Sequence, residues 1–327
     1  MKELYTPELL QPAVLKALNK PVVAKGSWQE VFGTDADEYF QAWSVAHCIG
    51  QVAAAGKAVY PLPLYVNAAL RDPLSNPGAD TYESGRPTDN VIPIWKAAAP
   101  AVDLLAPDIY LSGSEKILKV IDLYDRKDNA LFVPEAGFSG DKLKYLYEVI
   151  ARGGIGFSPF DIDDNGEGVA APPKTALRAA YGLEFAMMAP MVQQWAKWGF
   201  EGKIKAVVER EDQAAQTIDL GGWQAVVAFG GPGRGNKAPA NAQPTGKAMI
   251  VQLEENKFVL IGTRCHISFH PAGKNTGKAW QYDKVAEGHY ENGIFKLLRI
   301  LNGDETDWGG PRLGDAPTVL ETALIVR

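Results

Sequence analysis

The sequence predicts an α/β fold with a parallel sheet, followed by a β-rich C-terminal domain. Between residues 6 and 185, short apolar runs alternate with segments of helical periodicity, which favours parallel strands joined by crossover helices. Beyond residue 198 the apolar runs are separated by Gly, Asn and Asp, as is typical of antiparallel strands in a β-sandwich. We therefore divide the chain into residues 1–198 and residues 199–327.

Four apolar runs are expected to form the parallel strands. Each is short and is bounded by Gly, Pro or charged residues, as buried strands are. The runs cover residues 58–67, 102–111, 130–135 and 154–160.

Helices are expected before and between these strands. Thr6, followed by Pro7, has the pattern of an N-cap with proline at the first helical position. Thr34, with Asp37 three residues later, predicts a second helix start, ahead of an amphipathic stretch over residues 39–55. Further helices are expected near residues 91–99, 114–124, 141–151 and 174–188.

The C-terminal domain is expected to contain several antiparallel strands. They cover residues 204–208, 223–229, 248–253, 257–261, 264–269 and 318–326, with loops at 230–235 and 237–245.

Composition and net charge argue against several classes of binding partner. The chain has 327 residues, 46% of them apolar, and a formal net charge of −6, which disfavours nucleic acid and anionic membrane surfaces. No apolar run is long enough to span a bilayer, and no signal segment follows Met1. We expect a soluble chain, and the sequence leaves open whether its compartment is cytoplasmic or periplasmic. Cys48 and Cys265 have no metal or redox spacing, so both are expected to be free thiols.

Polar and aromatic side chains gather at the carboxyl ends of the four expected strands. In a barrel or an open α/β sheet these ends converge on one face, where catalytic and binding groups lie. The residues are Asn67, Asp108, Tyr110, Glu135, Phe160 and Asp161.

This combination suits a sugar ring, which offers hydroxyl groups at its edge and an apolar C–H face for stacking. Glycosidic hydrolysis usually requires two carboxyl groups, because the transition state resembles an oxocarbenium ion. Glu135 directly follows the apolar residues Val133 and Pro134 and lies two residues before Gly137. It is therefore the candidate nucleophile. The other five residues are candidates for substrate binding.

No cofactor or metal is expected. Residues 161–166 match the opening of a calcium loop, but the twelfth position is Pro172 instead of Glu. Residues 230–235 are glycine-rich but lack the Gly-Lys-Ser/Thr of a phosphate-binding loop. His266 and His270 lie four residues apart in an expected strand, where that spacing spans about 13 Å. Packing or surface roles are therefore favoured over zinc binding for these two residues and for Cys265 and His289.

Four segments together resemble the second half of the barrel of bacterial family 35 glycoside hydrolases, which are β-galactosidase-like enzymes with an appended C-terminal β domain. The segments are residues 60–68, residues 97–100 with 103–111, residues 133–136 and residues 154–160. The resemblance runs from about Ser27 to the C-terminus. It implies a (β/α)8 TIM-barrel type in which only strands five to eight are identifiable.

The resemblance also implies a reaction. Glu135 corresponds to the nucleophile at the end of strand seven, and the reaction would be retaining hydrolysis of terminal β-galactosides through a covalent glycosyl-enzyme intermediate. The general acid/base of this clan is a Glu directly after an Asn on strand four, and no Asn-Glu pair occurs in the 327 residues.

Several explanations for the missing acid stay open. The chain is either a truncated product, one piece of a split protein whose other part supplies the N-terminal half-barrel, or a refolded derivative with a different sheet. Assembly into a homo-oligomer also stays open. The alternative function is that of a non-catalytic fragment that binds carbohydrate without turnover.

Overall fold

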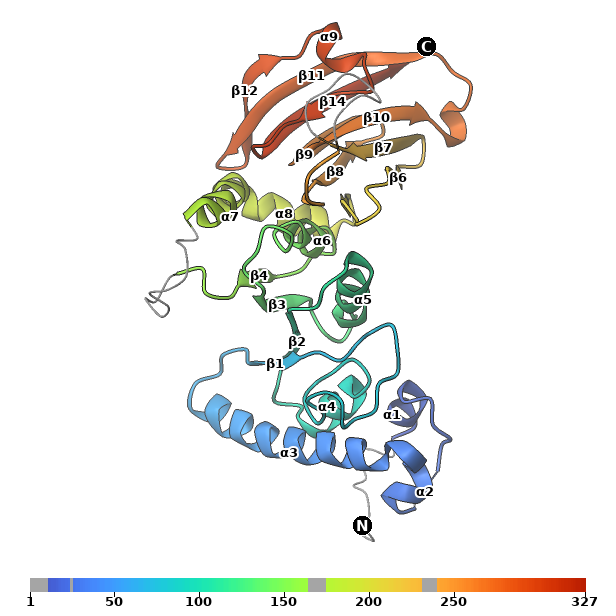
Figure 1. Cartoon of the computed structure of the whole chain (residues 1–327), viewed down its shortest axis with the longest axis vertical. Coiled ribbons are helices and arrows are strands. Elements are labelled where there is room, and N and C mark those ends of the chain that lie inside the picture. The colour runs from blue at the N-terminus through green and yellow to red at the C-terminus, as the bar shows by residue number, and fades with distance from the viewer. Residues whose placement is uncertain (1–10, 24–25, 164–174, 231–239) are drawn as a thin grey trace. The chain divides into compact units, whose positions relative to one another are not determined.

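The computed structural model describes residues 11–23, 26–163, 175–230 and 240–327, and most of its helices and strands are labelled in Figure 1. Contacts divide the chain into two compact units. The first comprises Met1–Gly137 with Ile155–Pro159, and the second comprises Phe138–Gly154 with Phe160–Arg327. The expected boundary between residues 198 and 199 stays a prediction. Across the described ranges, no helix combines the length and the apolar character needed to cross a membrane.

The first unit is built on a four-stranded parallel sheet, which confirms the predicted parallel strands. Its strands follow the order β1-β2-β3-β4, so β1 and β4 are its edges. A closed barrel is not present in the described part of the chain, and the eight-stranded barrel stays a prediction. The strands and their crossover helices are β1 (Tyr65–Ala69), α4 (Ile92–Ala98), β2 (Leu104–Ile109), α5 (Ser114–Tyr124), β3 (Phe132–Ala136) and β4 (Gly156–Pro159).

The two faces of this sheet differ in exposure. Ala68, Ile109 and Val133 are fully buried, and α5 packs on β2. Because successive side chains of a strand alternate between faces, Tyr65 and Asn67 lie opposite Ala68, and both are exposed. One face of the sheet therefore remains accessible at the strand ends that carry the candidate site.

The first predicted strand was placed too early. Residues 58 and 59 continue α3 (Ala36–Val59), and β1 begins only at Tyr65. The last turns of α3 are rich in alanine, the best helix former. The helix ends at Tyr60 because Pro61 disfavours helical backbone in the residue before it. The predicted N-cap at Thr34 was also wrong. Thr34 lies inside a 3₁₀ turn, η2 (Gly33–Asp35), and Asp35 occupies the cap position of α3 without a side-chain hydrogen bond.

Two shorter helices, α1 (Pro12–Ala17) and α2 (Trp28–Phe32), precede this long helix. Ser27 caps α2 in a reciprocal arrangement: its hydroxyl accepts from the Glu30 N–H, and the Glu30 carboxylate accepts from the Ser27 N–H. The helix start expected at Thr6 lies outside the described residues.

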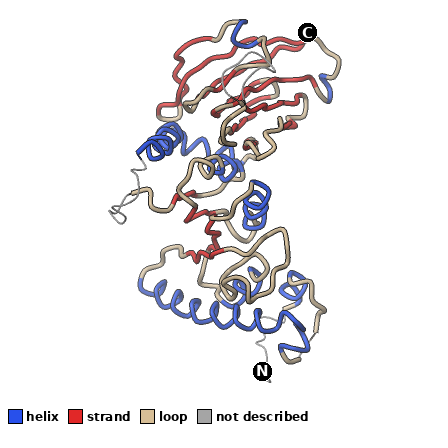
Figure 2. Tube along the Cα trace, in the orientation of Figure 1, coloured by secondary structure: helices blue, strands red, loops and turns tan. Residues whose placement is uncertain are grey.

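The second unit combines helices with two antiparallel sheets, as the distribution of helices and strands shows (Figure 2). One sheet has four strands in the order β13-β10-β7-β6, and the other has six in the order β12-β11-β14-β9-β8-β5. The predicted antiparallel region is thereby confirmed. The helical elements are α6 (Tyr145–Ala151), α7 (Thr175–Met188), η3 (Ala189–Met191), α8 (Val192–Phe200), η5 (Gly273–Asn275) and α9 (Gly303–Thr306). The strands are β5 (Ile204–Val208), β6 (Gln216–Asp219), β7 (Trp223–Phe229), β8 (Lys247–Glu254), β9 (Lys257–Thr263), β10 (Cys265–Pro271), β11 (Trp280–Glu291), β12 (Ile294–Ile300), β13 (Arg312–Leu313) and β14 (Thr318–Val326).

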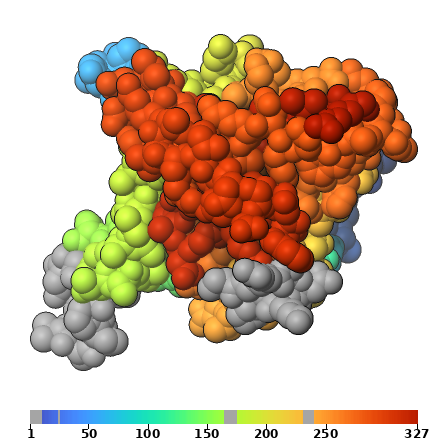
Figure 3. Space-filling model, turned by 90° about the horizontal axis from the view of Figure 1, so that it is seen from above, coloured from blue at the N-terminus to red at the C-terminus, as the bar shows by residue number. Residues whose placement is uncertain are grey.

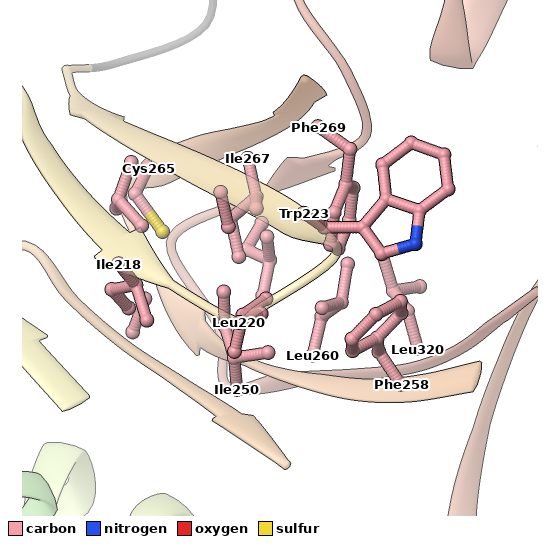
Figure 4. Packing of buried hydrophobic residues seen from close by; sticks show 14 of the residues in the cluster. Ile218, Leu220, Trp223, Ile250, Phe258, Leu260, Cys265, Ile267, Phe269 and Leu320 are labelled. Carbon is pink, nitrogen blue, oxygen red and sulfur yellow. The ribbon is translucent and has the colours of Figure 1, made fainter. Parts of the chain in front are cut away.

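An apolar core fills the space between the two sheets (Figure 4). Trp223 and Phe269 come from the four-stranded sheet, and Phe258 and Leu260 come from the six-stranded sheet; all four are almost completely buried. The Phe258 and Phe269 rings meet in a tilted arrangement, with 4.9 Å between their centroids. Burial of such side chains contributes roughly 1.5–3 kcal/mol each, so this core is the main stabilising element of the sandwich.

Strand β12 forms one edge of the six-stranded sheet and carries exposed aliphatic side chains. Ile294, Leu297, Leu298 and Ile300 are each at least half exposed. Residues of the C-terminal strands, orange to red in Figure 3, make up much of the face seen there. Among the described residues, strand β12 therefore presents apolar side chains along an edge of the sheet.

A buried ion pair links a helix of the second unit to the six-stranded sheet. The Lys247 ammonium lies 2.8 Å from a carboxylate oxygen of Glu184 and donates to the Thr263 hydroxyl at 2.8 Å. The other Glu184 oxygen accepts from the buried Tyr147 hydroxyl at 2.8 Å. Burial, together with this carboxylate, raises the pKa of Tyr147 far above its usual range, so the phenol remains a donor.

Removing one charge of this pair should destabilise the second unit strongly. Lys247→Met leaves Glu184 buried without its counter-charge, and we expect a loss of about 3–5 kcal/mol in the free energy of unfolding. Denaturant unfolding followed by tryptophan fluorescence measures the change. The double variant Lys247→Met/Glu184→Met should be less destabilised than the single variant. Lys257→Met, which breaks an exposed pair with Glu254, should cost no more than about 0.5 kcal/mol; equal losses for the two lysine variants would contradict the prediction.

Candidate active site

Parallel pairing brings two predicted site residues side by side. Asp108 on β2 is in register with Glu135 on β3. Adjacent strands lie about 4.8 Å apart, so the backbone attachment points of the two carboxylates are neighbours across the sheet. Asn67 lies one strand further along, on β1, and Tyr110 directly follows β2.

Asp108 is held by an amide group. The Asn67 Nδ2 donates to both carboxylate oxygens of Asp108, at 2.9 Å each. Asp108 is buried, with 8% of its surface exposed, whereas Asn67 is open to solvent on the accessible face. The Asn67 side chain thus covers the buried carboxylate and offers its own carbonyl oxygen as an acceptor.

Burial raises the pKa of Asp108 above its usual range. The hydrogen bonds from Asn67 act in the opposite direction, and the nearby charge of Glu135 raises the pKa further. Arg86 offsets part of this increase. The two neighbouring carboxyl groups therefore have different environments: Asp108 is buried and has a raised pKa, and Glu135 reaches the accessible face.

Tyr110 donates a short hydrogen bond from its hydroxyl to the Glu135 carboxylate. Burial and this carboxylate raise the pKa of Tyr110, so the phenol keeps its proton at neutral pH and remains a donor. A carboxylate fixed by a phenol donor has a defined orientation, as a nucleophile requires. Glu135 and Tyr110 are both reachable, since Glu135 is partly exposed and Tyr110 is about half exposed.

The remaining predicted residues, Phe160 and Asp161, directly follow β4 and belong to the second unit. Phe160 is exposed. Asp161 adopts a left-handed backbone conformation with φ of 61°, which Asp tolerates better than most residues. The structure thus brings Asn67, Asp108, Tyr110 and Glu135 together within the first unit, and the roles of Phe160 and Asp161 stay predictions.

Sequence reasoning missed an aromatic pair on the same sheet. The Tyr65 and Phe132 rings meet edge to face at 5.0 Å between centroids. Tyr65 is two residues before Asn67, and alternation along the strand places both on one face. The two-residue spacing between Tyr65 and Asn67 could have identified Tyr65 from the sequence. The electrostatic effect of Arg86 on Asp108 has no sequence signature.

Metal interpretations gain no support from the geometry. Within the described ranges, no three His, Cys, Asp or Glu side chains are grouped so that they could hold a metal ion. Cys265 is buried and Cys48 is exposed, and both are free thiols as predicted. His266 and His270 both lie in β10, as predicted for a strand. Of the segment with calcium-loop character, only residues 161–163 are among those described.

Part of the second unit matches a family model. Residues 181–310, from α7 to beyond α9, match a family described as a domain of unknown function, DUF5597. A search of curated proteins finds no match to the chain.

The coupling between the two carboxylates predicts how Asp108 titrates. In a carbon-detected NMR titration, its midpoint should lie above the usual range for aspartate. Glu135→Gln removes a charge that raises the pKa and should lower the midpoint, whereas Asn67→Ala removes hydrogen bonds that lower the pKa and should raise it. Asp72, which is paired with Lys116, is the internal reference and should not move. An unchanged Asp108 midpoint in Glu135→Gln would show that the two carboxylates do not interact.

Proposed function

We propose that this chain carries the nucleophile side of a glycoside hydrolase site that cleaves terminal β-galactosides with retention of configuration. The observation that carries the proposal is the Glu135 carboxylate, which lies at the carboxyl end of a parallel strand and is oriented by the Tyr110 hydroxyl. Strand ends of this kind hold catalytic groups in parallel barrels. The resemblance of the four strand segments to family 35 enzymes supports the galactoside as substrate.

The domain match adds independent support. DUF5597 domains accompany glycoside hydrolase domains, and residues 181–310 follow the four strands in the chain. A first unit that acts on carbohydrate is consistent with this association between domains. The proposal therefore includes the expected eight-stranded barrel. In that barrel, β1 to β4 are strands five to eight.

The proposed reaction has two steps. A carboxylate oxygen of Glu135 forms a bond to the anomeric carbon as the bond to the leaving-group oxygen breaks, and that oxygen takes a proton from a general acid. Water then attacks the same carbon and gives a proton back to the deprotonated general acid, while the bond between the carbon and Glu135 breaks and galactose is released. Tyr110 holds the nucleophile, and Asn67 and Asp108, in the same unit, bind sugar hydroxyls. The general acid is not identified in this chain.

A fluorinated galactoside with a dinitrophenyl leaving group tests the nucleophile separately from the missing acid. The dinitrophenolate leaves without protonation, and the fluorine slows hydrolysis of the covalent intermediate. We expect intact-mass measurement to show addition of one fluorosugar, with peptide mapping placing it on Glu135. Glu135→Gln should lack this adduct, and it should lower hydrolysis of the unfluorinated dinitrophenyl galactoside by roughly a million-fold, the scale on which loss of a covalent nucleophile acts.

A matched variant separates orientation from chemistry. Tyr110→Phe keeps the ring and removes the hydrogen bond to Glu135, so it should slow formation of the adduct without abolishing it. Labelling of any residue other than Glu135, or unchanged hydrolysis in Glu135→Gln, would refute the assignment.

A second function is favoured by one specific observation. The neighbouring carboxylate, Asp108, is buried, and both of its oxygens accept from Asn67, an arrangement that suits binding better than proton transfer to a substrate. The alternative is therefore a carbohydrate-binding fragment without turnover. Galactose binding in calorimetry, with neither adduct nor hydrolysis, would support this alternative.

A further inference from the structure

A cleft in the second unit lies at one end of the space between the two antiparallel sheets. Its volume is about 610 Å³, within the usual range for small-molecule sites. Its walls come from the end of β10, the beginning of β11, and the segment that joins β12 to α9 and β13. The whole lining falls within residues 268–310, inside the range that matches the domain of unknown function.

One wall of the cleft is aromatic. Trp280 and Tyr282 are both partly exposed, and their rings meet edge to face at 5.3 Å between centroids. Behind them, Trp280 packs on the fully buried Trp223 at 5.4 Å, and Tyr282 packs on Phe269 at 6.5 Å. Figure 4 shows Trp223 and Phe269 in the core that supports this wall. Because the core fixes both rings, a ligand that stacks on them loses little side-chain entropy.

The rim of the cleft is polar. Asp283 is exposed and lies where the register between β11 and β14 shifts, a β-bulge between Tyr282 and Lys284. Bulges of this kind change the direction in which a strand side chain points. Asn302 and Asp307 are exposed on the facing segment. The rim therefore presents carboxylate and amide groups from both β11 and the segment that follows β12.

Charge restricts the ligand. The charged lining residues are Asp283, Lys284 and Asp307, so the lining contains two carboxylates and one ammonium group, and the whole chain has a net charge of −6. An anionic ligand is disfavoured in such a field. A neutral ligand with an apolar face for the rings and many hydroxyl groups for the rim fits both surfaces.

We propose that this cleft is a non-catalytic binding site for neutral oligosaccharide chains. A sugar ring lies with its C–H face against Trp280 and Tyr282, while its hydroxyl groups donate to Asp283 and Asp307. The site lies outside the Asp108 and Glu135 constellation and does not require hydrolysis there. In this role the second unit holds a polysaccharide to the chain.

Affinity gel electrophoresis of the full chain tests the proposal, with β-1,4-galactan and galactomannan as neutral probes and polygalacturonate as the anionic comparison. We expect the neutral polymers to retard the protein and polygalacturonate to have no effect. Tyr282→Ala should weaken retardation about 10-fold, the scale of one aromatic contact. Tyr282→Phe is the matched control: it keeps the ring and removes only a hydroxyl that is itself buried, so retardation should persist.

A second pair of variants avoids the core. Asp283→Ala alters an exposed rim carboxylate and should weaken retardation, whereas Asp304→Ala alters an exposed carboxylate on α9 outside the lining and should not. Glu135→Gln should bind as the wild type does, which separates this site from the proposed nucleophile. The proposal is overturned by any of three results: no retardation by either neutral polymer, unchanged retardation in both Tyr282→Ala and Asp283→Ala, or loss of retardation in Glu135→Gln.

Discussion

The in-register pairing of β2 with β3 is the constraint on which the candidate site depends. It sets Asp108 beside Glu135, and two carboxylates on neighbouring strands repel unless their environments differ. The structure provides that difference through burial of Asp108 and through separate hydrogen-bond donors, an amide for Asp108 and a phenol for Glu135. A shift of one residue in the pairing would turn one carboxylate to the other face of the sheet. The short apolar strand Phe132–Ala136 is therefore as important to the site as the polar residue within it.

The second unit contains two different kinds of buried contact, an apolar core and an ion pair. Its sandwich core is apolar and closely packed, and one end of that core continues into the aromatic wall of the cleft. Helix α7 is instead joined to the six-stranded sheet by a buried ion pair between Glu184 and Lys247, and both charged groups also make hydrogen bonds. An apolar contact fixes position through shape, whereas a buried ion pair also specifies which partner must be present. The ion pair joins α7 to β8.

Buried strands and well-bounded helices could be predicted from sequence, as Ser114–Tyr124, Ile204–Val208 and Thr318–Val326 illustrate. Strand β11 was missed because charged residues, a bulge and Gly288 interrupt its alternation over 12 residues. The segment before Tyr65 was misassigned because a short alanine-rich run does not distinguish helix from strand. At the site, strand ends identified which residues to consider. They could not reveal that Asn67 binds Asp108, 41 residues away, because that contact arises only from strand order.

The exposed aliphatic side chains of β12 bear on how the chain behaves in solution. An edge strand with a free row of backbone groups is a template for pairing with another chain, and apolar side chains along that row lower the cost of removing it from water. Lys296 and Arg299 interrupt the row, and the net charge of −6 makes copies of the chain repel one another. Salt screens that repulsion but leaves the apolar contact intact. Self-association along β12 should therefore increase with ionic strength and with protein concentration, so dilute, low-salt buffers favour the separate chain.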